Sequence, residues 1–254
     1  MEAIKHDSFY FLHMAKCDGR RFIDSFVNPL IKSNPDIKCY TEYYTKHHDW
    51  VSPDNLAARE EDMAHQGWDS RISDSTYIVS ILRDPIERAA SWYAMVVDRK
   101  IKSKLNSKEE TRLYLDKNKF IDFVKNNTRF HNYYSKMILN DFTNNGSIIF
   151  DNSQLKNKEN INLVTSRFKR INILFKMEDL ANMDKMQISK KIIKDLDCSI
   201  FYPDLEKNKK SNPYTLPASK LLYDSLTEDD KNNLSQYLNI DYSIYNDDSL
   251  FWKP

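Results

Sequence analysis

Short apolar runs alternate with amphipathic segments along the chain. Each run is about as long as a buried strand and is bounded by polar residues. We predict strands in four places: Ser8 to Met14, Ile37 to Tyr44, Thr76 to Leu82, and a short piece of Ile171 to Leu180. Strands that alternate with helical segments are typical of an α/β domain with a mainly parallel sheet.

Helical periodicity occupies the intervals between these runs. Pro85 suits the first turn of a helix that follows the third strand. We predict further helices over Arg20 to Lys32, within Thr111 to Phe142, over Met186 to Leu196 and over Glu228 to Leu238. The segment Thr111 to Phe142 therefore predicts extra helices inserted after the third strand.

Composition limits the class of protein. The chain has 254 residues and is 41% hydrophobic, which is enough for one sizeable core, so we predict a single domain over residues 1–254. The 38 Lys and Arg residues nearly balance the 37 Asp and Glu residues. This balance gives no reason to expect nucleic acid or an acidic membrane as a partner, so a positive site must be local.

Cysteine usage and hydropathy indicate a cytoplasmic protein. Cys17, Cys39 and Cys198 are odd in number and widely spaced, which argues against a disulfide framework or a zinc site. The N-terminus is too polar for a signal peptide, and no segment has the apolar length of a membrane span.

The stretch FYFLHMAKCDGRRF, from Phe9 to Phe22, joins the first strand to the first helix. A turn of this kind directs backbone N–H groups and the positive end of the helix dipole at one point, which suits a phosphate or sulfate. Lys16, Arg20 and Arg21 add positive charge. The alternative is an ordinary turn with solvated basic residues. The stretch lacks the glycines and the lysine position of a Walker A loop.

A second stretch, YIVSILRDPIERAASWY, places Arg83 at the carboxyl end of the third strand. Ligands of open α/β sheets bind at this edge. Ser91 follows about two helical turns later. A structural alternative pairs Arg83 with Asp84 or Glu87 and makes Ser91 a small packing residue.

Together these motifs resemble the sulfotransferases that use 3'-phosphoadenosine 5'-phosphosulfate (PAPS), in particular the heparan sulfate 2-O and 6-O branch. FLHMAKCDGRRF resembles the loop F-L-H-x-x-K-T-G-G-T-S-F, and the second stretch resembles L-R-D-P-x-x-R-x-x-S-x-[WY]. HNYYSKMILNDF resembles the helix N-x-Q-x-R-x-L, ILFKMEDL the strand before an acidic turn, and KNKKSNPY a late N-K-S loop. The resemblance implies a P-loop-like central parallel sheet flanked by helices.

The resemblance also implies roles for residues that bind the donor. Lys16 and the backbone of the turn would hold the 5'-phosphosulfate, and Arg83 with Ser91 would hold the 3'-phosphate. His13 would be structural or close to the donor. The implied donor-binding set is Lys16, Cys17, Asp18, Gly19, Arg20, Arg21, Arg83, Ser91, Lys209, Lys210 and Ser211.

The turn departs from the family pattern at the four positions where the family has Thr, Gly, Thr and Ser. Cys17, Asp18, Arg20 and Arg21 stand there instead. Arginine can hold an anion through two hydrogen bonds, which would preserve binding. Asp18 brings a negative charge beside the expected anion, so a relative that binds without catalysis is an alternative.

The catalytic residues implied by the resemblance are a general base and a lysine. YYTKHHDW resembles the H-A-D-W segment of the 6-O branch and selects His47 as base, with His48 as the neighbouring candidate. Histidine suits the role because its unperturbed pKa is about 6.5. Lys16 would stabilise the leaving group. His48, Trp50 and Asn132 are assigned to acceptor binding, and a polar surface loop is the alternative for the His pair.

The predicted function is transfer of a sulfuryl group from PAPS to a hydroxyl of a carbohydrate or small molecule. Adenosine 3',5'-bisphosphate (PAP) would be the product, and no metal is expected. One alternative is a nucleotide-dependent kinase, which should show a full P-loop and a Mg²⁺-binding carboxylate. The other is a catalytically silent protein that binds anions or glycans.

Overall fold

The computed structural model describes residues 6–14, 16–40, 67–68, 72–102, 115–139, 152–180, 182–203 and 216–254. Its centre is a parallel sheet of four strands in the order β2-β1-β3-β4. The strands are β1 (Ser8–Leu12), β2 (Lys38–Tyr40), β3 (Thr76–Leu82) and β4 (Ile173–Lys176). Every pairing is parallel, and the β1–β3 ladder runs from Ser8 opposite Thr76 to Leu12 opposite Ser80. The α/β class predicted from the sequence is confirmed.

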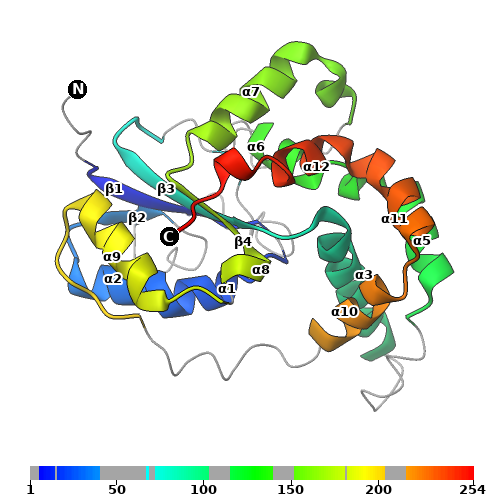
Figure 1. Ribbon diagram of the computed structural model, residues 1–254, viewed down its shortest axis with the longest axis horizontal. Helices are drawn as coiled ribbons and strands as arrows, with labels where there is room; N and C mark the ends of the chain where they lie inside the picture. The colour runs from blue at the N-terminus through cyan, green and yellow to red at the C-terminus, as the bar shows by residue number, and fades with distance from the viewer. Residues whose placement is uncertain are drawn as a thin grey trace, which may run out of the picture.

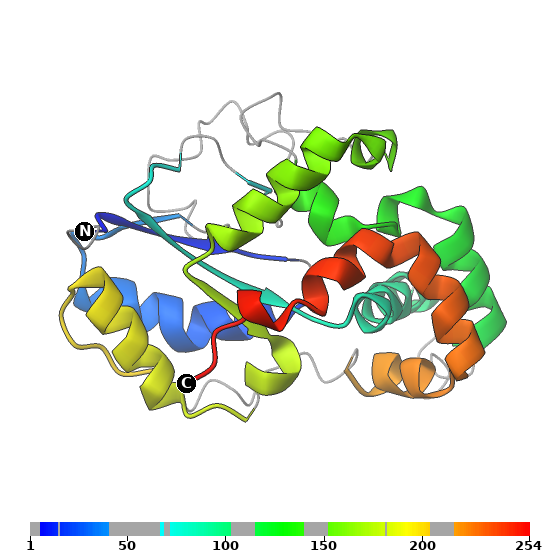
Figure 2. The same cartoon turned by 45° about the horizontal axis from the view of Figure 1, so that its top comes forward.

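Helices cover both faces of the sheet (Figures 1 and 2). One face carries the helical run α1 (Gly19–Phe22), η1 (Ile23–Val27) and α2 (Asn28–Ser33), together with α9 (Lys185–Leu196), and the other carries α7 (Lys158–Lys169). Side chains from these helices and all four strands form one hydrophobic cluster. The sheet is therefore buried on both faces, which explains why β1 and β3 are buried throughout and mostly apolar.

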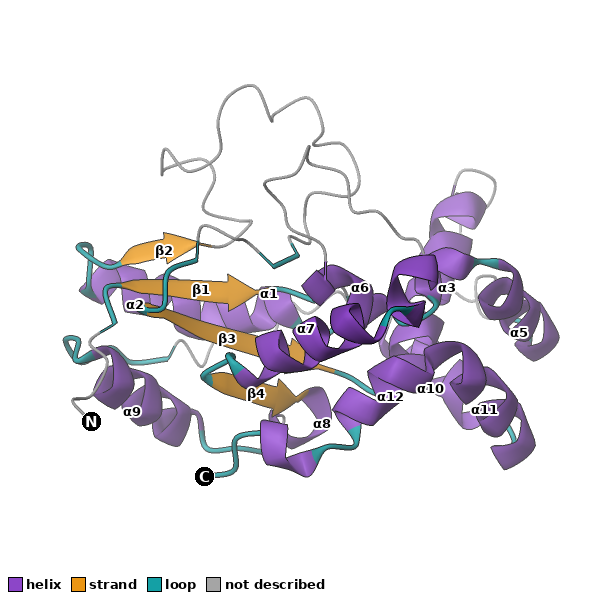
Figure 3. Cartoon of the chain, turned by 90° about the horizontal axis from the view of Figure 1, so that it is seen from above, coloured by secondary structure: helices purple, strands orange, loops and turns teal. Residues whose placement is uncertain are grey.

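A second group of helices lies beyond the carboxyl ends of the strands (Figure 3). It contains α3 (Pro85–Lys102), α5 (Lys117–Asn126), α10 (Leu216–Asp224), α11 (Glu228–Ser235) and α12 (Asn239–Tyr245). Residues of α3, α5, α10 and α11 form a hydrophobic cluster of their own around Ala89, Phe120 and Leu222. The carboxyl edge of the sheet thus faces a packed helical layer.

Shorter elements complete the described chain. They are α6 (Tyr133–Leu139), α8 (Met177–Leu180) and the 3₁₀ turns η4 (Thr128–Phe130), η5 (Asn152–Lys156), η7 (Gln236–Leu238) and η8 (Asp248–Leu250). Between β3 and β4 the chain passes through α3, α5, α6 and α7. None of the helices in the described ranges is both long and apolar enough to cross a lipid bilayer.

Three segments differ from the sequence expectation. The first strand ends at Leu12 rather than Met14, because the chain turns to place Lys16 in a left-handed conformation. The fourth run is a strand only to Lys176 and continues as the helix α8. The first helix contains the π-helical segment η1, which ends at Val27, two residues before Pro29; proline lacks an N–H group and cannot make the regular helical bond.

Candidate functional site

The turn between β1 and α1 has an unusual backbone. Lys16 and Asp18 have positive φ angles of 67° and 62°, a region that non-glycine residues seldom occupy. Gly19 begins α1, and a Cβ added there would lie 2.0 Å from Cδ2 of His13. The glycine is therefore required by the close approach of the histidine ring. Strained turns of this kind persist where the surrounding structure fixes them, which is common at binding sites.

Two charged side chains beside this turn, Asp18 and Arg21, form an ion pair. Arg21 Nη1 lies 3.1 Å from Asp18 Oδ2, within the first turns of the helical run. Burial raises the pKa of the Asp18 carboxyl, while the positive charges of Arg21 and Arg83 and the nearby His13 oppose this rise. The anion expected at this turn would therefore meet a resident carboxylate.

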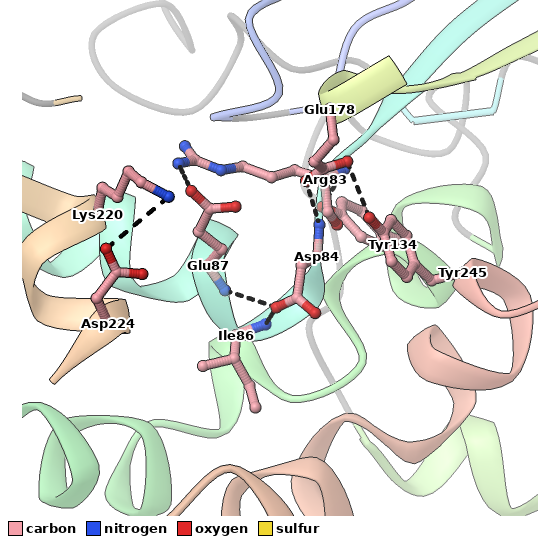
Figure 4. Close-up of polar contacts among 9 residues, drawn as sticks. All are labelled: Arg83, Asp84, Ile86, Glu87, Tyr134, Glu178, Lys220, Asp224 and Tyr245. Atoms are coloured by element: carbon pink, nitrogen blue, oxygen red, sulfur yellow. Dashed lines mark hydrogen bonds and ion pairs between the residues drawn. The ribbon is translucent and has the colours of Figure 1, made fainter. Parts of the chain in front are cut away.

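The turn between β3 and α3 is held by Asp84. Its Oδ1 accepts hydrogen bonds from the backbone N–H groups of Ile86 and Glu87, each at 2.9 Å, which caps α3 (Figure 4). Its carboxylate also accepts a hydrogen bond from Tyr242 at 3.0 Å. The amino end of α3 is therefore filled by the protein's own carboxylate, so its free amides are not offered to a ligand.

Arg83 follows β3 directly and is almost completely buried, with 2% of its surface exposed. Its Nη2 is bonded to Glu87 Oε1, one of the two partners that the sequence left open (Figure 4). Burial alone would lower the pKa of the guanidinium, but the Glu87 carboxylate raises it above its ordinary value. Nε of Arg83 is buried without a hydrogen-bond partner within the described chain. Ser91 is buried on α3.

The two turns lie at the same edge of the sheet. Their strands, β1 and β3, are direct neighbours and run in the same direction. Cys17 and Arg83 are further linked through the hydroxyl of Tyr134, a residue of α6. Burial raises the pKa of the Cys17 thiol to about 11, so the thiol is protonated at neutral pH. Sequence reasoning did not identify Tyr134.

A third strand end contributes Glu178 of α8. Its Oε1 lies 3.4 Å from the Asp84 backbone nitrogen, and its Oε2 accepts a hydrogen bond from Tyr245 at 2.8 Å (Figure 4). Tyr242 and Tyr245 both belong to α12, so this helix contacts two turns of the edge. The sequence did not indicate that α12 contributes to this edge, because its contribution depends on contacts with residues more than sixty positions away.

A pocket of about 230 Å³ lies beside the first turn. It is lined by Asp18, Arg21, Phe22, Ser25, Phe26, Met177, Leu180 and Lys185. Its walls come from one face of the α1–η1 run and from α8 and the start of α9. It therefore combines apolar walls, which suit a ring, with two cations, Arg21 and Lys185, and with the carboxylate of Asp18, which pairs with Arg21.

Arg88 is a second buried arginine near this edge. Its guanidinium nitrogens make no hydrogen bond in the described structure, and its Cζ lies 4.0 Å from the centre of the Tyr133 ring. Its positive charge also acts on Cys17 and Asp241 and opposes the burial that raises their pKa values. Arg88 thus adds positive charge behind the two turns.

The structure brings some of the predicted residues together. Lys16, Cys17, Asp18, Gly19, Arg21 and Arg83 all belong to the two neighbouring turns. Asn132 lies elsewhere: its Oδ1 accepts hydrogen bonds from the backbone N–H groups of Ile240 and Asp241 at the start of α12. Its amide is engaged within the protein, and acceptor binding by Asn132 stays a prediction.

Other predicted residues are outside the described part of the chain. These are His47, His48, Trp50, Lys209, Lys210 and Ser211, and the side chain of Arg20 is likewise not described. Within the described residues, no three His, Cys, Asp or Glu side chains form a group that could hold a metal ion.

Comparisons with models of protein families, with curated proteins and with solved structures return no match to this chain. What the site binds is therefore inferred from its own residues.

Proposed function

We propose that the chain is a sulfotransferase with a P-loop-like sheet, which moves a sulfuryl group from PAPS to a hydroxyl of a carbohydrate or small molecule. The observation that carries the proposal is the meeting of two basic turns at one edge of the sheet. Lys16 and Arg21 belong to the turn after β1, and Arg83 belongs to the turn after the adjacent parallel strand β3. Two anion sites on one ligand distinguish a 3'-phosphorylated donor from ATP.

Each part of the donor has a matching region. The 5'-phosphosulfate would lie at the β1–α1 turn, beside Lys16 and the start of α1, where it would compete with the Asp18 carboxylate for Arg21. The 3'-phosphate would lie against Arg83 and Ser91. The adenine ring of the donor would enter the 230 Å³ pocket. Phe22 and Leu180 supply apolar walls there, and Asp18 and Arg21 connect the pocket to the β1–α1 turn.

The transfer itself requires a base and a stabilised leaving group. The acceptor oxygen would form a bond to sulfur while the bond from sulfur to the 5'-phosphate oxygen breaks. That oxygen keeps the electron pair and leaves as part of PAP, with Lys16 offsetting its charge. The hydroxyl proton would pass to His47, the base implied by the sequence.

A silent anion-binding protein is the second candidate, and a specific observation favours it. Two arginines of the edge already have carboxylate partners: Arg21 pairs with Asp18, and Arg83 pairs with Glu87. A donor would have to compete with these internal pairs. The kinase alternative predicts Mg²⁺-dependent binding of ATP, which neither turn favours by its residues.

Calorimetry with the product PAP tests the proposal. We expect binding in the micromolar range that is the same with Mg²⁺ and with EDTA, and no comparable binding of ATP. Leu180→Trp should fill the pocket and weaken PAP by about tenfold while the protein stays folded. The exposed Leu163→Trp on α7 is a matched control and should bind as wild type. Failure of wild type to bind PAP, or Mg²⁺-dependent ATP binding, would overturn the proposal.

A silent relative is separated from an enzyme by a second measurement on the same protein. Labelled donor is incubated with the protein and a panel of hydroxylated acceptors. An enzyme transfers the label and releases PAP, whereas a silent relative binds PAP equally well and transfers nothing.

A further inference from the structure

The Tyr134 hydroxyl makes every hydrogen bond available to it. It donates to the Arg83 carbonyl oxygen at 2.8 Å and accepts from the Arg83 backbone N–H at 3.2 Å. Cys17 Sγ lies 3.2 Å from the same oxygen. A hydroxyl has one proton and two acceptor positions, and its proton is already used, so the protonated Cys17 thiol is the donor. One buried oxygen therefore joins the two turns.

The hydrogen bonds of the Tyr134 hydroxyl connect the two turns at a point beyond the last paired residues of β1 and β3. The β1–β3 ladder ends at Leu12 opposite Ser80, before either turn begins. The spacing between Cys17 and Arg83 is thus not set by strand pairing alone, and the tyrosine closes the gap. Figure 4 shows Tyr134 against the backbone of Arg83.

Tyr134 is itself held rigidly. Its backbone N–H and that of Ser135 each donate to the Asp241 carboxylate at 2.9 Å, and the Ser135 hydroxyl donates to it at 2.7 Å. Asp241 belongs to α12, whose start is bonded by Asn132. The Arg88 guanidinium lies 5.5 Å from the centre of the Tyr134 ring. The ring is fully buried among these groups, so its hydroxyl has a fixed position.

We propose that Tyr134 is a positioning residue that sets the distance between the two anion-binding turns. A ligand with two anionic groups at a fixed separation, such as a nucleoside 3',5'-bisphosphate, then binds without the cost of ordering the turns. A ligand with a single anionic group uses one turn and gains little from the link. The inference rests on the proposed function, because it assumes that both turns bind one nucleotide.

Tyr134→Phe is the sharpest variant because it keeps the ring and removes only the hydroxyl. Affinities are measured by calorimetry for three probes: adenosine 3',5'-bisphosphate, adenosine 5'-phosphate and adenosine 3'-phosphate. We expect the bisphosphate to weaken by about tenfold and each monophosphate to change by less than about threefold. Cys17→Ala removes the hydrogen bond between Cys17 and Tyr134 from the other side. It should also reduce the preference for the bisphosphate over the monophosphates, but by less than Tyr134→Phe does.

The control is Tyr77→Phe, which also removes a buried tyrosine hydroxyl. Tyr77 donates to Asp195 at 2.5 Å and lies in β3 near the opposite end of the sheet from the two turns. It should lower thermal stability and leave the preference for the bisphosphate at the wild-type value. A merely structural role for Tyr134 predicts that Tyr134→Phe behaves like this control.

The outcomes separate the two proposals. A wild-type protein that prefers the bisphosphate, with the preference reduced in Tyr134→Phe, supports the inference. An unchanged preference in both Tyr134→Phe and Cys17→Ala, or an equal loss for all three ligands, overturns it and leaves the proposed function intact. Absence of bisphosphate binding by wild type overturns the proposed function and this inference with it.

Discussion

The two turns at the carboxyl edge of the sheet follow neighbouring parallel strands but are built differently. The turn after β1 is strained, with positive φ angles at Lys16 and Asp18, and it leads into α1 without an acidic residue in the helix's first turn. The turn after β3 has no positive φ at its non-glycine residues, and Asp84 caps its helix. An anion at the first turn would meet the start of α1 together with the Asp18 carboxylate, which directly precedes the helix and pairs with Arg21. The second turn can offer only the Arg83 side chain.

The difference shows how one sheet edge can hold two anionic groups in distinct ways. Backbone amides at a helix start accept any small tetrahedral anion. A buried guanidinium is more selective, because its planar donors and its fixed position favour one direction of approach. We therefore expect the first turn to provide most of the general affinity and the second to provide the preference for a 3'-phosphate.

The largest expected effect is on turnover and concerns Lys16 of the first turn. Lys16→Met should lower sulfuryl transfer from labelled donor by about 10²–10³-fold, as for loss of a preorganised group at a developing charge. PAP affinity should fall by much less. Lys38→Met, an exposed lysine of β2, is the matched control. Transfer at the wild-type rate in Lys16→Met would break the assignment of the reacting group to the first turn.

A stability effect comes next and tests the strained geometry itself. Gly19→Ala should lower the free energy of unfolding by about 1–3 kcal/mol, because the new Cβ collides with the His13 ring. Urea denaturation measures the loss. His13→Ala should make room for the new Cβ. Gly19→Ala should therefore lower the free energy of unfolding by less in the His13→Ala background than in wild type. Equal losses in both backgrounds would contradict the contact.

A smaller effect concerns the carboxylate of the first turn. Asp18→Asn should strengthen PAP binding by about three- to tenfold at neutral pH, because it removes a negative charge beside the anion. Asp24→Asn, further along the same helical run, is the control and should change affinity little. Weaker binding in Asp18→Asn would mean that Asp18 helps to hold the ligand or orders Arg21.

The pH dependence of that difference is the finest test. Burial raises the folded-state pKa of Asp18 above its ordinary value of 3.8, so the carboxyl is neutral well below that raised pKa and charged above it. The ratio of the Asp18→Asn affinity to the wild-type affinity should therefore be near one in acid and rise as the pH passes through the raised pKa. The titration of the ligand's phosphates cancels in this ratio. A ratio independent of pH would contradict the inference that the negative charge of Asp18 weakens ligand binding.

Much of the sheet could be predicted from sequence, because β1 and β3 are buried on both faces and consist mostly of apolar residues. The segments Met186 to Leu196 and Pro85 onward were likewise predicted as helices and are confirmed as α9 and α3. The helices α7, α10 and α12 were not predicted. The polar residues of α12, which include the buried Asp241, find their partners far away in the chain, and periodicity does not reveal such contacts.

The site could be predicted only in part for the same reason. The motifs located Lys16 and Arg83 because each follows a strand whose end is recognisable. They did not decide between a free and a paired Arg83, since pairing with Glu87 depends on side-chain geometry along α3. Tyr134 and Glu178 reach the edge from other elements, and only the folded chain places them there.

The central claim is that the two turns together bind one nucleotide with two anionic groups. Its most direct test is the ratio of affinities for adenosine 3',5'-bisphosphate and adenosine 5'-phosphate, measured by calorimetry in wild type and in Arg83→Ala. We expect wild type to prefer the bisphosphate by about 10–150-fold, as for a hydrogen bond to a charged group, and Arg83→Ala to lose this preference while it keeps its affinity for the 5'-phosphate. Arg170→Ala, which removes hydrogen bonds near the amino end of β3, should keep the preference. A wild type without the preference, or an Arg83→Ala variant that retains it, would contradict the account.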